Sequence, residues 1–124
     1  MSKEIREIGE GAMTAIVELV EQYREACDGD DYEAEEGARE AIECDPLEIT
    51  VSGSAPLGEH IEPDTLTILL STGGPATRIV CDIDRHGEPY NPQLQVQDWG
   101  TPWTDVPQDT EILGEYVSIL GVCV

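Results

Sequence analysis

The chain has 124 residues, a length that favours a single domain spanning residues 1–124. Its 27 acidic and 6 basic residues give a formal net charge of -21, whereas a small domain ordinarily has a net charge of about 2–8. So few basic side chains argue against direct binding of nucleic acid or of an anionic membrane, because both attract Lys and Arg. The charge instead favours a basic protein surface as the partner.

The first two elements that we expect are helices. Over residues 3–26, apolar residues recur at intervals of three and four, the period of one helix face. Gly9 and Gly11 interrupt this helix and mark either close packing or a frayed start. A second helix is expected over residues 31–44, with Asp30 or Asp31 as its N-cap and with Pro46 beyond its end.

From residue 47 onward the apolar residues alternate with polar ones, which is typical of half-buried strands. This alternation predicts strands at residues 47–51, 65–70, 78–83 and 93–97. The connections between them contain Gly and Pro, so we expect tight turns and an antiparallel meander of four strands.

The end of the chain predicts an aromatic loop and a third helix. Trp99 and Trp103 follow the last expected strand, and we expect Trp99 in the core, with the loop folded over the end of the sheet. A helix is expected over residues 107–120, with Pro107 near its first turn. The predicted fold class is therefore α+β, with two N-terminal helices, a four-stranded antiparallel sheet and a C-terminal helix.

The acidic turns do not match a calcium-binding loop, which requires Gly at position six and Glu at position twelve. Counted from Asp28, position six is Glu33, and counted from Asp82, position twelve is Gln93. The four cysteines form no C-x-x-C pair, so we expect free thiols and no zinc site. We therefore expect neither a metal nor a cofactor.

The sequence favours a binding protein over an enzyme, and we expect no catalytic residue. Both histidines, His60 and His86, fall in expected loops, and no nucleophile elbow, zinc-protease motif or phosphate-binding loop is present. No apolar run is long enough to cross a membrane, and the N-terminus lacks the apolar stretch of a signal peptide. The expected location is the cytoplasm.

The acidic side chains of the two N-terminal helices form rows. Acids three or four residues apart on a helix place their Cβ atoms about 5–6 Å apart. Such a row can imitate the phosphates of DNA, which follow one another at a rise of about 3.4 Å along each strand. The residues that we expect to contact a basic partner are Asp30, Asp31, Glu33, Glu35, Glu36 and Glu40 of the second helix, and Glu4, Glu7 and Glu10 of the first.

Residues 66–104 resemble a family of small acidic proteins encoded by phages and other mobile elements of proteobacteria. The string QDWGTPW at residues 97–103 is the most specific part of this resemblance, and residues 45–51 fit it as well. By analogy in size, charge and genomic origin, the resemblance implies an inhibitor of a bacterial defence system, above all an anti-CRISPR protein. Such a protein would bind the basic DNA-binding site of a Cas effector complex in the host cytoplasm and exclude target DNA.

Three other interpretations stay open, and one of them is a small enzyme, which would need a cleft with perturbed titratable groups. An anti-restriction protein that mimics DNA would show the same acidity. An acidic accessory or structural domain adapted to high salt would also combine many acids with few lysines, and Lys3 is the only lysine in the chain. The sequence is compatible with a monomer or a small homo-oligomer.

Overall fold

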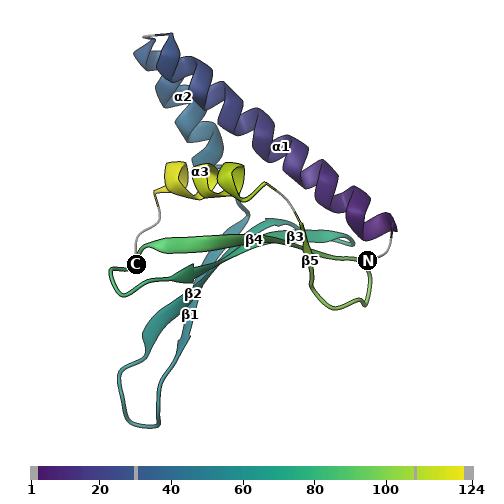
Figure 1. Ribbon diagram of the computed structural model, residues 1–124, viewed down its shortest axis with the longest axis vertical. Helices are drawn as coiled ribbons and strands as arrows, with labels where there is room; N and C mark the ends of the chain where they lie inside the picture. The colour runs from purple at the N-terminus through teal and green to yellow at the C-terminus, as the bar shows by residue number, and fades with distance from the viewer. Residues whose placement is uncertain (1–2, 30, 108, 122–124) are drawn as a thin grey trace.

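A computed structural model describes residues 3–29, 31–107 and 109–121 (Figure 1). Its α+β class and its C-terminal helix confirm the expectation from the sequence, but the antiparallel sheet has five strands, in the order β1-β2-β3-β4-β5. The elements in chain order are α1 (Lys3–Asp28), α2 (Tyr32–Glu43), β1 (Glu48–Ser54), β2 (Glu62–Ser71), β3 (Ala76–Ile83), β4 (Pro89–Gln97), β5 (Thr104–Val106) and α3 (Thr110–Leu120).

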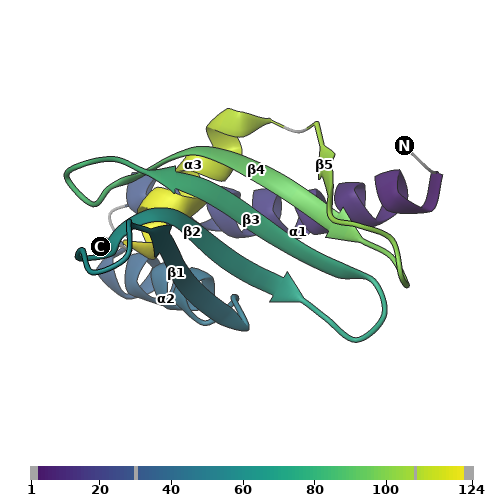
Figure 2. The same ribbon diagram turned by 90° about the horizontal axis from the view of Figure 1, so that it is seen from below.

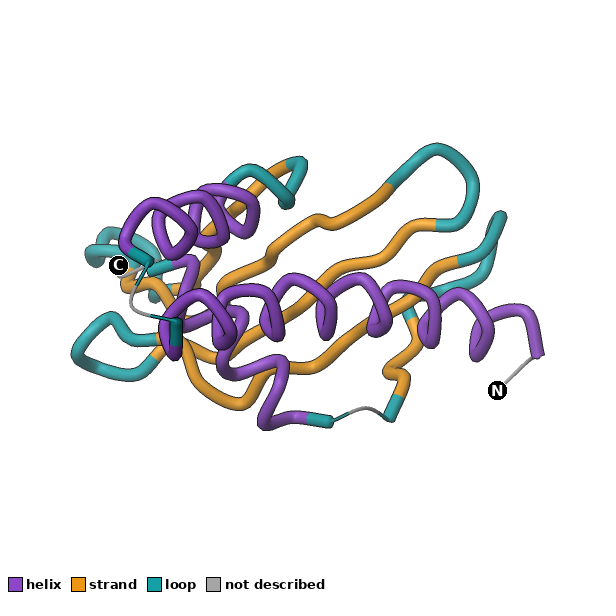
Figure 3. Tube along the Cα trace, turned by 90° about the horizontal axis from the view of Figure 1, so that it is seen from above, coloured by secondary structure: helices purple, strands orange, loops and turns teal. Residues whose placement is uncertain are grey.

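The helices form a layer over one face of the sheet (Figures 1 and 3). The long helix α1 crosses the sheet, and α2 returns beside the C-terminal half of α1, so the two helices form a hairpin that rises away from the strands. Figure 2 shows the opposite face of the sheet, which no element in the described part of the chain covers. The hairpin of β1 and β2 extends beyond the helical layer as an arm.

Side-chain caps define the starts of two helices. Of the two expected candidates, Asp31 is the N-cap of α2, and its carboxylate accepts hydrogen bonds from the backbone N–H groups of Glu33 and Ala34. Asp109 caps α3 in the same way, so this helix begins at Thr110 and not at residue 107. Because the cap satisfies the first free N–H groups, it fixes the start of the helix more firmly than a preceding proline does.

The core lies between the helical layer and the covered face of the sheet. The buried side of α1 contributes Ile5, Met13, Ile16 and Val20. The helix α2, the sheet and α3 contribute the other main buried side chains, which are Ile42, Leu66, Ile68, Ile79, Cys81, Leu94, Val96, Leu113, Tyr116 and Val117. The hydroxyl group of Tyr116 donates a hydrogen bond of 2.7 Å to the carboxylate of Asp45, so the one phenol among these side chains is satisfied.

The prediction that the first strand is half-buried is wrong. Ile49 and Val51 pair with the fully buried Ile68 and Leu66 of β2 and therefore lie on the helix-facing side of the sheet. They are nevertheless 39% and 44% exposed, because the helical layer ends before it reaches β1. The alternation of residue types identified the strand and its apolar face, but not whether another element covers that face.

The fifth strand and the early start of β4 were also missed. The strand β5 has only three residues, and it pairs with β4 through Leu94 and Val106. The three residues of β5 lie between Pro102 and Pro107 and are too few to show an alternation of apolar and polar residues. The strand β4 begins at Pro89, within a segment that its prolines had marked as a turn.

The prediction that Trp99 lies in the core is wrong, because its side chain is 78% exposed. The indole ring lies against the turn between β2 and β3, where a Cβ atom on Gly74 would be 3.2 Å from Cζ2 of Trp99. Trp103 instead stacks on the guanidinium group of Arg78, which is 4.0 Å from the ring centroid. Both tryptophans therefore pack at the surface of the sheet.

The two glycines in the first half of α1 have different environments. A Cβ atom on Gly9 would lie 2.8 Å from Cγ1 of the buried Val106, whereas nothing lies within 4 Å of a Cβ atom on Gly11. Gly9 thus permits the close approach of α1 to β5, and Gly11 only weakens the helix.

We expect opposite effects from alanine at these two positions. Gly9→Ala should lower the free energy of unfolding by about 1–2 kcal/mol through overpacking, and Gly11→Ala should raise it by about 0.5–1 kcal/mol through helix propensity. Urea unfolding followed by circular dichroism measures both. Changes of the same sign would contradict the contact between α1 and β5.

Candidate functional site: an acidic helical surface

The outer side of α1 has a row of acidic residues along nearly its whole length. The buried side of the helix faces the sheet, and the acids recur at intervals of three and four on the opposite side, interrupted only at Gly11 and Thr14. Every member of this row is exposed: Glu4, Glu7, Glu18, Glu21, Glu25 and Asp28. Glu10 borders the row.

A second row lies on α2. Glu33, Glu36, Glu40 and Glu43 follow one another at intervals of three and four residues and are all exposed. They point away from Ile42, the one buried residue of this helix. We call these four residues, together with Glu18, Glu21, Glu25 and Asp28 of α1, the acidic hairpin surface.

The other acids predicted on the second helix have structural partners or lie outside the described residues. Asp31 caps α2, and Glu35 is partly buried, with an ion pair of 3.5 Å to Arg39. Asp30 lies outside the residues that the structure describes. Of the six acids predicted there, Glu33, Glu36 and Glu40 are therefore exposed without an intrahelical role.

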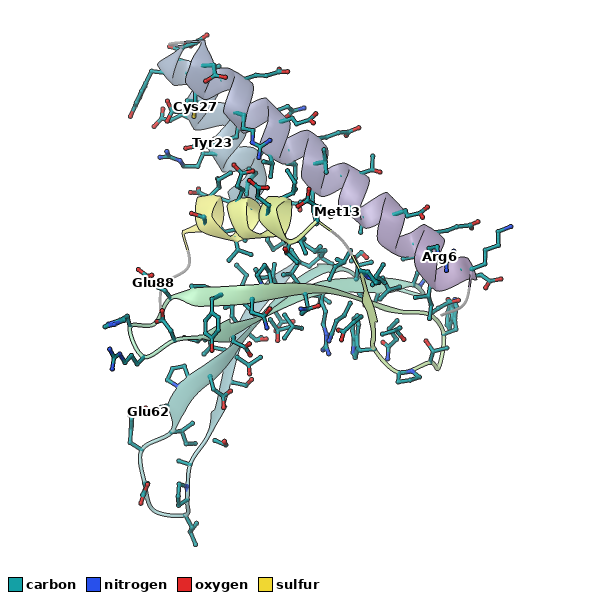
Figure 4. All side chains as sticks on the ribbon, viewed as in Figure 1. Arg6, Met13, Tyr23, Cys27, Glu62 and Glu88 are labelled. Carbon is teal, nitrogen blue, oxygen red and sulfur yellow. The ribbon has the colours of Figure 1, made fainter. Side chains whose placement is uncertain are left out.

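The predicted acids of the first helix lie at the far end of α1 from the acidic hairpin surface. Figure 4 shows Arg6, which adjoins Glu4 and Glu7, at one end of α1, and Tyr23 and Cys27 at the other end, beside the start of α2. Along α1, Glu4 is about 21 Å and Glu10 about 12 Å from Glu18, the nearest member of that surface. The structure therefore does not bring Glu4, Glu7 and Glu10 together with Glu33, Glu36 and Glu40.

The sequence interpretation missed the acids that connect these two groups. Glu18, Glu21, Glu25 and Asp28 lie on the half of α1 along which α2 returns (Figure 1). Their spacing opposite the apolar stripe of α1 was a usable signal, because residues on the far side of a packed helix face solvent. What the sequence did not show was that α2 folds back along this half of α1.

The arginines of the hairpin bind acids outside the two rows. Arg24 of α1 forms an ion pair with Glu115 of α3, and this hydrogen-bonded partner raises the pKa of its guanidinium group. Arg39 donates a hydrogen bond of 3.1 Å to the hydroxyl group of Tyr23 and stacks on its ring, and its pKa is raised by this partner above all. Arg24 links α1 to α3 and Arg39 links α2 to α1, and their charges also attract one acid of each row, Glu21 and Glu43 respectively.

A hollow of about 330 Å³ lies between α3 and the start of β4, and its lining includes Cys81, Tyr90, Val117 and Ser118. Burial raises the pKa of the Cys81 thiol to about 11, so the sulfur is protonated at neutral pH and is a poor nucleophile. Within the described ranges, no group of three or more His, Cys, Asp or Glu residues is arranged to hold a metal ion. The hollow thus lacks an activated group.

Comparison of the chain with models of known families, with curated proteins and with solved structures finds no match. Among the helices that the structure describes, none is long and apolar enough to span a bilayer.

Proposed function

We propose that this protein inhibits a bacterial defence system by mimicking DNA, and specifically that it is an anti-CRISPR protein. It binds the basic DNA-binding site of a Cas effector complex and excludes the target duplex. The observation that carries this proposal is the acidic hairpin surface, in which eight exposed acids lie in two rows on neighbouring helices.

The dimensions of the rows support mimicry of a duplex. From Glu4 to Asp28 the whole row on α1 is about 36 Å long, close to the 34–36 Å of one turn of DNA, and the acidic hairpin surface occupies about the last 15 Å of it, beyond the gap at Gly11 and Thr14. Within the acidic hairpin surface, neighbouring acids of one row are about 5–6 Å apart, so a groove that neutralises successive phosphates also finds successive carboxylates there. The basic protein releases its bound anions in both cases, and binding should therefore weaken with salt.

The rows are also held in a fixed arrangement. Ile16 and Val20 anchor α1 in the core, and Ile42 anchors α2, each with an exposed fraction of 1% or less. A surface that is already ordered loses little conformational entropy on binding. A disordered acidic tail of the same charge would lose more.

The proposal is tested by affinity purification from a bacterial host that has a CRISPR–Cas system, with the full chain as bait. We expect the Cas effector complex to be retained, to be released by duplex target DNA, and to bind less tightly as salt increases. Retention of no DNA-binding defence protein would refute the proposal. A melting temperature that rises steeply towards molar salt, with no retained partner, would favour salt adaptation instead.

A further inference from the structure

The strand β1 is an uncovered edge of the sheet. The sheet ends at β1 on one side and at β5 on the other, and the two edges differ. The edge at β5 is three residues long, and α1 packs against it through Gly9 and Val106. The edge at β1 is seven residues long, and its backbone groups on the outer side have no neighbouring strand in the described chain.

This edge also has uncovered apolar side chains. Leu47, at the entry to the strand, is 60% exposed, and Ile49 and Val51 are exposed on the helix-facing side of the sheet. The apolar face that β2 and β3 bury against the helices therefore continues onto β1 without a cover. Long edge strands with exposed apolar side chains pair readily with another strand.

The charge around β1 indicates what kind of strand would pair with it. Residues 46–58 contain a single charged residue, Glu48, in a chain with 27 acids. A basic partner protein would find almost no acid to bind along this edge, whereas a second copy of this highly acidic chain meets the least repulsion here. The edge also has no Lys, which many proteins use to block such pairing.

We propose that two copies of this chain associate through their β1 edges in an antiparallel, two-fold symmetric pair, which joins the two sheets into one. The two-fold axis passes through Ile49. In this register Ile49 lies opposite its own copy and Leu47 lies opposite Val51, so all six apolar side chains adjoin on one face. Glu48 lies opposite Thr50, and no two acids of the ladder face each other.

This association is independent of the proposed function, because it uses the sheet edge and leaves the acidic hairpin surface free. A backbone ladder of about five residues per chain buries an area at the small end of the range for specific interfaces. We therefore expect a dissociation constant in the micromolar range, and a tighter dimer at high salt, where the repulsion between the two chains is screened.

The test is the mass of the full chain in sedimentation equilibrium, from about 1 to 200 µM, at 0.15 M and at about 1 M salt. We expect twice the 13.5 kDa mass of one chain at the upper concentrations. Ile49→Lys should restore the single-chain mass, because it places two lysines against each other even though it lowers the net negative charge. The matched control is Tyr32→Lys, an exposed apolar residue of α2, and it should leave the dimer intact.

A single-chain mass throughout, or a dimer that Ile49→Lys leaves unchanged, would overturn the proposal, whether or not another protein binds β1. Cysteine cross-linking tests the register in a background with Cys27, Cys44 and Cys123 replaced by serine. Ile49→Cys should form a disulfide-linked dimer on oxidation, because facing Cβ atoms are about 4.5–5.5 Å apart. Val51→Cys should form far less, and the reverse order would contradict the pairing at Ile49.

Discussion

Lysine at Glu33, Glu36, Glu40 and Glu43 together is expected to weaken binding to the Cas effector complex by at least about 100-fold, because close charge pairs in interfaces contribute more than 1 kcal/mol each. All four side chains are exposed, and none is a cap or an ion-pair partner of the helix hairpin. The fold should therefore persist, which circular dichroism and thermal melting would verify. Competition with duplex target DNA measures the loss of affinity.

A matched variant separates a specific surface from net charge alone. Glu59, Glu62, Asp64 and Glu88 are also exposed acids, and they lie in the β1–β2 arm or the β3–β4 turn, away from the hairpin (Figure 4). Their replacement by lysine changes the net charge by the same amount, so long-range attraction to a basic partner falls equally. We expect this variant to retain most of the affinity. An equal loss of affinity in both variants would mean that α2 contributes to binding only through its net charge and not through a specific surface.

The largest loss of stability is expected from a truncation in the middle of the sheet. Ile79 lies on the central strand β3, is fully buried and pairs with Ile68 and Leu94 on the neighbouring strands. Ile79→Ala should lower the free energy of unfolding by about 3 kcal/mol, since it removes buried methyl groups and leaves a cavity that the rigid sheet cannot close.

The matched substitution is Ile61→Ala, at a residue that is 61% exposed in the β1–β2 arm. It should cost less than about 0.5 kcal/mol, because little apolar area is removed from the core. Urea unfolding gives both values from the shift in midpoint at constant slope. A cost for Ile79→Ala below that for Ile61→Ala would contradict the core described above.

The periodic elements of this fold could be predicted from the sequence. The stripe of α1 and the alternation in β2 and β3 reflect one covered face each, so the pattern of residue types records the burial directly. Asp31 was recognisable as a cap because it directly precedes the helical pattern, and the side-chain oxygen of Asp can accept hydrogen bonds from the first backbone N–H groups of a helix.

The errors concern what covers each element. The alternation in β1 is as clear as that in β2, yet Ile49 is exposed and its pairing partner Ile68 is buried, because the β1–β2 arm extends away from the helical layer (Figure 1). Trp99 was assigned to the core from its residue type, but a ring of this size can also lie on a turn such as that at Gly74. Neither the exposure of Ile49 nor that of Trp99 can be predicted from the residues next to it in the sequence.

The candidate site was predictable in part, because its acids follow the period of a helix. The spacing of Glu33, Glu36 and Glu40 already defined a solvent-facing row. Whether this row joined Glu4 and Glu7 or the acids near Glu25 depended on the direction in which α2 returns along α1. That direction is set by tertiary packing, which brings Ile42 into the core.

The separation between the buried side of α1 and its acidic side has an evolutionary consequence. Residues such as Ile16 are constrained by folding, whereas under the proposed function Glu18 and Glu21 on the opposite side would be constrained mainly by the partner. Substitutions on the outer side can therefore accumulate at little cost to the scaffold. Under the proposed inhibition of a host defence system, the contact residues could change one at a time while the inherited architecture is retained.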